Sequence, residues 1–377
     1  MKLPPIAIYC SSGSWGGLEM NTVRLARWMC ERHHQVTLFC LENSPLAKHA
    51  SAEGVPLRFI FRNKRYFDIL EAIVVKRKLD RLNIRIVILV DNRDLDFGGL
   101  VKLLYRNKIR LVYQQHMRLG TQKKDPIHTF RFRQLDAWIT LLPYMKEEIL
   151  TRTSFPKERI HLIPLGLEVD RLQASLPSKQ IARQQLRLPT HGFILGILGR
   201  LDPQKGQHLV IEAVKLLKAQ GVDCLLLIMG ETTKGEGDNY LQQLQDLVDE
   251  NGMQNDVFFR GYQDDIAGFY AAIDLFVLGS FEETYGMVTI EAMLCGIPVI
   301  GSRAGGTTEL LGNGKFGWLY RAKNPLDLAA TINLAISNPE KLKQVSFAAM
   351  EHATTNYSHL EECTKVEQLL KNLDDLR

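Results

Sequence analysis

Apolar residues occur along the chain as short continuous runs separated by longer amphipathic stretches. Because the runs do not alternate with polar residues, a strand formed by one of them would be buried on both faces, as in parallel sheets covered by helices. The intervening stretches, such as 20–32 and 207–219, place apolar residues at helical spacing. The pattern predicts an α/β protein. The predicted strands cover residues 6–10, 36–41, 56–61, 85–90, 111–115, 137–142, 159–163, 193–198, 224–229 and 257–261.

The alternation of strands and helices occurs twice, before and after a polar stretch that ends at Pro189. At 377 residues the chain exceeds the size at which one hydrophobic core usually suffices. The sequence therefore predicts two domains, each with its own parallel sheet.

The stretch 279–302 carries the strongest chemical signal. A helix is predicted to begin near Thr284 to Gly286 and to run to Cys295, and its free amides and dipole would favour a phosphate. Glu291 lies about 7.5 Å along that helix from Gly286, at roughly 1.5 Å per residue, which is comparable with the reach from a diphosphate to its ribose. A carboxylate there would accept hydrogen bonds from a ribose diol. Taken alone, however, Glu283 and Glu291 are also typical of surface glutamates near a helix start.

A second predicted strand exit, residues 199–206, contains two cations between two glycines. Arg200 offers a planar fork and Lys205 a point charge, and five residues of turn allow both to contact one diphosphate. Ligands of open parallel sheets bind at the carboxyl ends of the strands. One ligand is therefore predicted to contact Arg200, Lys205 and the Glu291 helix together.

These segments closely resemble the signature of glycosyltransferase family 4, which consists of retaining enzymes with the GT-B architecture. The matching residues are Glu283-Thr-Tyr-Gly, Glu291-Ala-Met, Gly296-Ile-Pro-Val and, at 199–206, Gly-Arg-Leu-x-Pro-x-Lys-Gly. The resemblance implies two Rossmann-like, doubly wound parallel-sheet domains that face each other across a cleft.

The resemblance also implies domain boundaries. Residues 1–170 would bind the acceptor and 191–355 the nucleotide-sugar donor, with a linker at 171–190. A terminal helix within 356–377 would return to the first domain. The segment 164–170 resembles the family's interdomain turn, although Leu165 replaces the usual asparagine and Glu168 is inserted before Val169.

The same resemblance assigns roles to individual residues. His116 follows a predicted strand, where the family has a histidine that contacts the donor sugar, and Gly16 and Gly17 match a Gly-Gly pair that faces the donor phosphates. The implied catalytic residues are His116, Arg200, Lys205 and Glu283. The implied donor-binding residues are Gly16, Gly17, Arg200, Lys205, Gly261, Tyr262, Tyr285, Gly286, Met287, Val288 and Glu291.

Neither a metal nor another cofactor is expected, because fixed cations and a helix N-terminus would stabilise the departing diphosphate. Asp94-Leu-Asp96 has the DxD form of metal-binding glycosyltransferases of another architecture. The pattern around it does not match that architecture, and strand ends commonly carry aspartate.

Charge divides the chain into a basic and an acidic half. The balance of Lys and Arg over Asp and Glu is +15 for residues 1–190 and −10 for 191–377. Lys76, Arg77 and Lys78 lie on a predicted helix whose apolar stripe is Ile69, Ile73, Val74 and Leu79 or Leu82. They indicate either a solvated helix face or attraction to an anionic membrane. Arg118, Lys123, Lys124, Arg131 and Arg133 would receive an anionic acceptor. Nucleic acid is not an expected partner, because no recognisable nucleic-acid module accompanies the basic residues.

Apolar runs, the N-terminal residues and the cysteines together indicate the cellular compartment. No apolar run reaches the ~18 residues that span a bilayer, and the N-terminal residues lack the pattern of a signal peptide. Six scattered cysteines are typical of a reducing compartment. A cytoplasmic protein is expected, peripheral on the inner face of the cytoplasmic membrane if the basic domain binds lipid.

The expected activity is a retaining sugar transfer (EC 2.4) from a nucleoside-diphosphate sugar to an acceptor hydroxyl. The acceptor would be a lipid-linked or cell-surface glycan, such as lipopolysaccharide. Two alternatives stay open at this point. One is a nucleotide-sugar 2-epimerase of the same architecture, and the other is a membrane-surface scaffold with a degenerate transferase fold.

Overall fold

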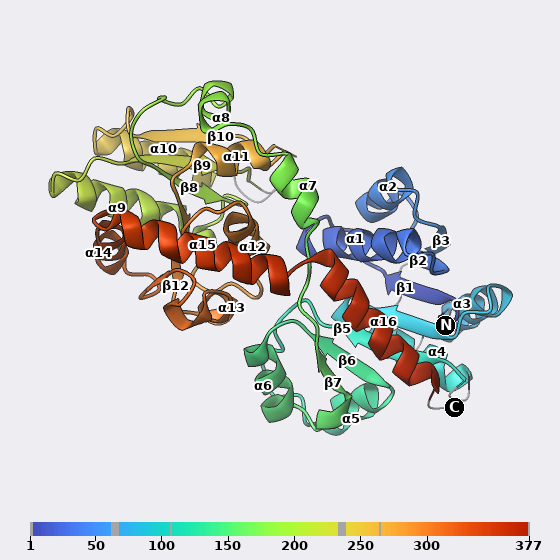
Figure 1. The fold of residues 1–377 in the computed structure, drawn as a ribbon. Helices are drawn as coiled ribbons and strands as arrows, with labels where there is room; N and C mark the ends of the chain where they lie inside the picture. Colours follow the sequence, from blue (N-terminus) through green and yellow to red (C-terminus); the bar gives the residue numbers. More distant parts are fainter. Residues whose placement is uncertain (1–2, 62–67, 106–107, 233–238, 264, 376–377) are drawn as a thin grey trace. The chain divides into compact units, whose positions relative to one another are not determined.

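The computed structural model describes residues 3–61, 68–105, 108–232, 239–263 and 265–375, which divide into two compact units (Figure 1). The first unit contains the chain up to Gly166 together with the residues from His359 onward, and the second contains Leu167–Ser358. Residues 171–190, expected as a linker, contain two short helices and group with the second unit.

The first unit is built on a parallel sheet, in which the described residues form seven strands in the order β3-β2-β1-β4-β5-β6-β7. The chain proceeds outward from β1 through β3, returns to the centre at β4, and then proceeds the other way. The carboxyl ends of β1 and β4 therefore form a topological switch point, where open sheets bind ligands. The strands are β1 (Ile6–Cys10), β2 (Val36–Leu41), β3 (Leu57–Ile60), β4 (Ile86–Leu89), β5 (Arg110–Gln114), β6 (Ala137–Thr140) and β7 (Ile160–Leu162).

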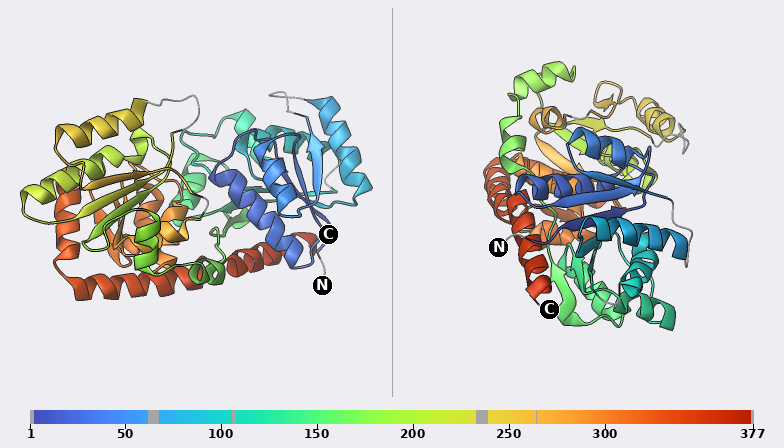
Figure 2. Two further views of the ribbon diagram at one scale, coloured as in Figure 1. Left: turned by 90° about the horizontal axis from the view of Figure 1, so that it is seen from above. Right: turned by 90° about the vertical axis from the view of Figure 1, so that its right-hand side faces the viewer.

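Helices cover both faces of this sheet (Figure 2). Along β1, Ile6 and Ile8 enter one hydrophobic core, while Ala7 and Tyr9 enter another on the opposite face. This double burial explains why the strands read as continuous apolar runs. The helices are α1 (Gly17–Glu31), α2 (Pro45–Ala52), α3 (Ile69–Arg81), α4 (Leu95–Leu104), α5 (Pro126–Arg133), α6 (Pro143–Arg152) and α16 (His359–Asp375).

The second unit repeats the design with six parallel strands in its described residues, in the order β10-β9-β8-β11-β12-β13. Its strands are β8 (Ile194–Leu198), β9 (Leu225–Met229), β10 (Val257–Arg260), β11 (Leu275–Leu278), β12 (Val299–Ser302) and β13 (Trp318–Tyr320). Its helices are α7 (Val169–Ala174), α8 (Lys179–Gln185), α9 (Gln207–Ala219), α10 (Asn239–Glu250), α11 (Ala267–Ala272), α12 (Met287–Leu294), α13 (Gly305–Leu310), α14 (Pro325–Ile336) and α15 (Pro339–Asn356). The predicted fold class, two Rossmann-like parallel-sheet domains, is confirmed.

The predicted apolar stripe of α3 is right at Leu79 but otherwise wrong by part of a turn. The helix buries Glu71, Ala72, Val75 and Leu79, whereas Ile69 is half exposed. Glu71 is inside because its carboxylate accepts a hydrogen bond from the backbone N–H of Phe61, so a polar side chain takes a position that the apolar pattern gave to its neighbours. Among the described residues, none of the helices combines the length and the apolar character needed to cross a bilayer.

Candidate functional site

The candidate site of the second unit lies where β8 and β11 end side by side. The two strands pair in parallel, and β9 lies on the other side of β8, so their exits form the switch point of the sheet. The loop after β8 and the loop after β11 approach each other through their backbones at Gly206 and Gly279. Gly206 has φ 71°, and a Cβ added there would overlap the carbonyl oxygen of Gly279. Glycine is required at 206 because the two backbones touch.

Lys205 and Glu283, both predicted site residues, are in direct contact. The Lys205 Nζ lies 2.8 Å from Glu283 Oε2, and the Ser280 hydroxyl donates to the same oxygen at 3.0 Å. The Lys205 side chain is 34% exposed and that of Glu283 is 18% exposed. The ammonium group is therefore held in place and still open to a ligand from solvent.

Arg200 leaves β8 on the same loop and is half exposed. Its guanidinium Nη2 lies 2.6 Å from Asp202 Oδ2, while Asp202 Oδ1 accepts a hydrogen bond from the backbone N–H of Gln204 at 2.8 Å. Asp202 thus fixes the short turn of the loop and orients the arginine at the same time.

Helix α12 begins beside this cluster without a side-chain cap. Its N-cap is Gly286, with φ 90°, and Met287 and Val288 form its first turn. Their backbone N–H groups have no carbonyl four residues earlier within the helix to bind. Three of the predicted donor-binding residues therefore form an uncapped helix start, which is favourable for an anion.

Glu291 lies one turn further along α12 and is largely buried, as is the predicted donor-binding Tyr285. Its Oε2 accepts a hydrogen bond from the Tyr270 hydroxyl at 3.0 Å, and this hydroxyl also lies 3.1 Å from the carbonyl of Val288. Burial and the neighbouring carboxylate raise the pKa of Tyr270, which keeps the phenol a donor. Sequence reasoning missed Tyr270. The available signal was a tyrosine within the apolar segment that follows Ala267.

The predicted base-reading segment, Gly261 and Tyr262, follows β10. A Cβ added at Gly261 would lie 3.4 Å from Glu231 Oε1, and the Glu231 carbonyl accepts a hydrogen bond from Leu201 at 2.9 Å. Tyr262 is 46% exposed. The exits of β8, β9 and β10 are therefore joined at one edge of the sheet.

In the first unit, Gly16 is the N-cap of α1, which also begins without a side-chain cap. A Cβ added at Gly17 would meet no atom within 4 Å. The fold requires a glycine at position 206 but not at position 17. The open space at Gly17 is therefore available to a ligand.

His116 follows β5, and its ring is half buried. Its Nε2 is enclosed and has no hydrogen-bond partner among the described residues. Burial lowers the pKa of His116 to about 4, opposed by a smaller effect of Asp91. The ring is therefore neutral at pH 7.

The two aspartates of the DxD segment have separate partners. Asp94 is fully buried and accepts hydrogen bonds from the backbone N–H and the hydroxyl of Ser11, and burial raises its pKa to about 7. Asp96 lies 3.3 Å from Arg131. Arg118 pairs with Glu148, so two arginines of the predicted basic acceptor surface contact carboxylates, and the acceptor surface itself stays a prediction.

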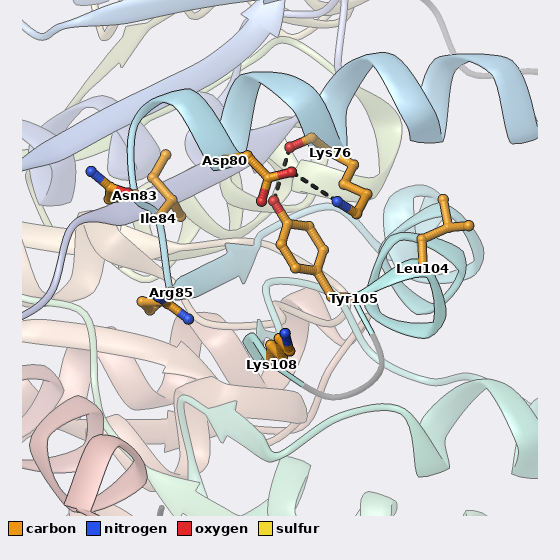
Figure 3. A pocket seen from close by; sticks show the side chains of 8 residues that line it. All are labelled: Lys76, Asp80, Asn83, Ile84, Arg85, Leu104, Tyr105 and Lys108. Carbon is orange, nitrogen blue, oxygen red and sulfur yellow. Dashed lines mark hydrogen bonds and ion pairs between the residues drawn. The ribbon is translucent and has the colours of Figure 1, made fainter.

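A cavity of about 290 Å³ lies at the other edge of the first sheet (Figure 3). Its lining includes Arg85, directly before β4, and Lys108, shortly before β5. It therefore belongs to the amino-terminal edge, whereas the site residues follow the carboxyl ends. Within it, Lys76 Nζ lies 2.8 Å from Asp80, and the Tyr105 hydroxyl donates to the Lys76 carbonyl. The cavity is separate from the candidate site.

Two family models match the chain. The model for glycosyl transferases group 1 matches residues 178–352, and the model for glycosyltransferase family 4 matches residues 15–171. The chain is 30% identical over 198 residues to the D-inositol 3-phosphate glycosyltransferase of Corynebacterium jeikeium, an alignment that covers 52% of this chain and 47% of the relative. The chain spans about half the length of the curated relatives it matches.

Solved structures match over almost the whole chain. The Anabaena protein HepE in complex with UDP has a TM-score of 0.85 at 23% identity, covering 98% of this chain and 100% of that one. The lipopolysaccharide outer core galactosyltransferase WaaB has a TM-score of 0.72 at 16% identity, covering 99% of each chain. At these identities the likeness shows the fold.

Proposed function

The chain belongs to glycosyltransferase family 4, and we propose that it is a retaining enzyme that moves a sugar from a nucleoside-diphosphate sugar to an acceptor hydroxyl. The observation that supports this most directly is the cluster of Lys205, Glu283 and Ser280 beside the uncapped start of α12. A partly exposed cation next to free backbone N–H groups suits a diphosphate.

In the proposed reaction, the bond between the sugar C1 and the diphosphate oxygen breaks, and negative charge develops on that oxygen. Lys205, the Arg200 fork and the first N–H groups of α12 are fixed before the reaction and stabilise this charge without rearranging. These groups supply the positive charge that a divalent ion supplies in other transferases. No metal or other cofactor is therefore part of the proposal.

The acceptor oxygen forms the new bond on the face that the diphosphate leaves, and the acceptor proton passes to the departing phosphate oxygen. Retention needs no enzyme nucleophile in this course. We propose that neutral His116 hydrogen-bonds a sugar hydroxyl. Glu291, oriented by Tyr270, would accept from the ribose diol.

UDP is the first nucleoside diphosphate to test, because the structurally similar HepE was crystallised with UDP. A cell-surface or lipid-linked glycan is the proposed acceptor class. Its support is the similarity to the lipopolysaccharide outer core galactosyltransferase WaaB and the excess of basic residues in the first half of the chain.

A second proposal concerns docking of the first unit on an anionic membrane. Leu70 is 80% exposed and Ile69 is 51% exposed at the start of α3, and Arg77 is exposed on the same helix. Lys76 is paired with Asp80 and Lys78 donates to the Phe59 carbonyl, so their charges are less available than the sequence indicates. Apolar contact by Ile69 and Leu70, with attraction to Arg77, would hold the unit at the lipid surface.

Co-sedimentation with vesicles of phosphatidylglycerol and phosphatidylcholine tests the docking. We expect Leu70→Glu to reduce binding several-fold and Arg77→Glu to reduce it in a salt-dependent way. Leu334→Glu is the matched control, because Leu334 is 64% exposed on α14 of the second unit. Equal binding by all three variants would contradict this docking surface.

Calorimetric titration with UDP, GDP and ADP tests the proposed function itself. We expect one diphosphate to bind, and Glu291→Gln to weaken that binding about tenfold, since a hydrogen bond to a charged group contributes about 1.5 kcal/mol or more. Glu340→Gln, an exposed control on α15, should bind like the wild type.

Failure of every nucleoside diphosphate to bind would contradict the transferase and favour a scaffold. Product analysis after incubation with the nucleotide sugar alone excludes the epimerase. A transferase releases free sugar slowly, whereas an epimerised nucleotide sugar would overturn the proposal.

A further inference from the structure

Trp15 is the one exposed tryptophan of the four in the chain, all of which lie in the described residues. It is 39% exposed, whereas Trp28, Trp138 and Trp318 are at most 9% exposed. It lies in the loop between β1 and α1, directly before Gly16, at the carboxyl edge of the first sheet. An exposed indole at the edge where this fold binds ligands calls for a physical reason.

Hydrogen bonds fix the loop that carries Trp15. The Ser11 N–H donates to Asp94 Oδ2 at 2.9 Å, and the Ser12 hydroxyl donates to the buried Glu19. The Ser14 N–H in turn donates to the Ser12 hydroxyl at 3.2 Å. Two buried carboxylates therefore fix the backbone just before the tryptophan, and the side chain is presented by a preorganised loop.

The indole is also oriented by a neighbouring ring. His49, on α2, stacks on Trp15 with 3.9 Å between ring centroids and 8° between planes. At that separation His49 covers one face of the indole, so the exposed 39% of Trp15 lies elsewhere on the ring. The result is a partly exposed apolar ring of fixed orientation, two residues before Gly17, where an added Cβ would meet open space.

We propose that this surface of Trp15 is a subsite for a sugar ring of the glycan acceptor, a proposal that rests on the proposed glycosyltransferase function. One face of a pyranose carries C–H groups with partial positive charge, and the face of an indole is electron-rich. A rigid side chain with two torsions loses little conformational entropy on binding. The ring hydroxyls stay free to hydrogen-bond elsewhere.

The rival ligand for such a surface is a nucleobase, since bases also stack on aromatic side chains. The donor base is assigned to the segment at Gly261 and Tyr262 in the second unit. The first unit is the predicted acceptor domain. The sugar of an acceptor is therefore the ligand that this surface favours.

The experiment uses the exposure of Trp15 as its signal. Acrylamide quenches an exposed indole far more than buried ones, so quenching in the whole protein reports mainly on Trp15. The probes are delipidated lipopolysaccharide core oligosaccharide, lactose, maltose and UDP, each added to the wild-type protein. We expect at least one glycan to lower the quenching constant about twofold and UDP alone to leave it unchanged.

Variants supply a second readout. Trp15→Ala should raise the KM for the glycan acceptor about tenfold, within the range for one stacked ring, with a much smaller change in kcat. Trp15→Tyr should restore most of the affinity because it keeps an aromatic face. Trp318→Phe removes a buried tryptophan of the second unit and should retain both the glycan protection and the wild-type KM.

The outcomes separate this proposal from the one on which it depends. If UDP binds but no glycan protects Trp15, or if the acceptor KM is unchanged in Trp15→Ala, the sugar subsite is overturned. Protection by UDP alone would assign the surface to a nucleobase and also overturn it. Failure of any nucleoside diphosphate to bind the wild-type protein would instead contradict the proposed function.

Discussion

The two units place candidate site residues at the same edge of the same kind of sheet, but with side chains in opposite environments. In the second unit, Lys205 and Arg200 are partly exposed and paired with carboxylates at the surface. In the first unit, Asp94 is buried, and burial shifts the pKa of Asp94 upward and that of His116 downward. One edge offers charge, and the other carries the neutral ring of His116 and an exposed indole. The difference favours an anionic ligand at the second unit and a neutral, hydrogen-bonding ligand at the first.

The largest effect on activity is expected from removal of the Lys205 charge in the second unit. We expect Lys205→Met to lower kcat about 10²–10³-fold, as loss of one group that stabilises charge in a transition state typically does. Lys218→Met is the control, because Lys218 also pairs with a carboxylate, that of Asp256, at the surface of the second unit but lies far along α9. The measurement is release of the nucleoside diphosphate that binds in the titration, in the presence of acceptor. A similar kcat for both variants would contradict the role of Lys205.

Substitution by alanine should destabilise the protein strongly at Gly206 and hardly at Gly17. Gly206→Ala forces a left-handed φ and an overlap with Gly279, so we expect the free energy of unfolding to fall by about 3 kcal/mol. Gly17→Ala meets open space at a helix start, and its free energy of unfolding should change by less than about 0.5 kcal/mol. Urea unfolding followed by circular dichroism measures both.

Activity completes this test. If a ligand uses the space at Gly17, Gly17→Ala should lower kcat/KM although the protein is as stable as the wild type. Wild-type activity in a fully folded Gly17→Ala protein would show that the space serves no ligand.

His116 should act as a neutral group. We expect His116→Phe to lower kcat/KM about 10-fold to 30-fold, since it removes one hydrogen bond to the substrate. The folded-state pKa is about 4 against an ordinary 6.5, so the unfolded state binds the proton first as the pH falls. The contribution of His116 to stability is therefore present above pH 6.5 and lost between pH 6.5 and 4. Thermal unfolding across this range should lose that pH dependence in the variant.

The smallest expected effect concerns Glu362, a buried carboxyl on α16 of the first unit. It accepts a hydrogen bond from the Gly166 N–H at 2.6 Å, and burial raises its pKa from 4.5 to about 7. Between these values only the folded state keeps the proton, so stability falls as the pH rises from 4.5 through 7. Glu362→Gln should match the wild type at pH 4.5 and exceed its free energy of unfolding by about 1–2 kcal/mol at pH 8.

The matched control for this prediction is Glu361→Gln, whose side chain is 43% exposed on the same helix. Denaturant unfolding at the two pH values measures both variants. A Glu362→Gln protein that is less stable than the wild type at pH 8 would show that the buried carboxyl is favourable when ionised.

The fold and the charged edge were predictable because each depends on residues close together in sequence. Continuous apolar runs indicate strands with two buried faces, and the segments 199–206 and 279–291 carry their chemistry within a few residues. The contact of Lys205 with Glu283 joins two such segments at neighbouring strand ends. Predicting it required only that β8 and β11 be adjacent.

The rest depends on partners that sequence alone does not pair. Arg118 and Arg131 read as free cations until the fold places Glu148 and Asp96 beside them. The support of Glu291 by Tyr270 and the stacking of Trp15 on His49 each join residues from different helices or loops. Side-chain pairs of this kind follow from tertiary packing rather than from local pattern.

The assignment of α16 to the first unit has a consequence for synthesis on the ribosome. Val366, Leu370 and Leu373 fill the same core as β1 and α1, although the ribosome adds them after all of Leu167–Ser358. The second unit can fold as soon as its residues emerge, whereas the first unit waits with an uncovered apolar face until the last helix arrives. Chaperone protection during translation should therefore be needed by the half of the protein that is made first.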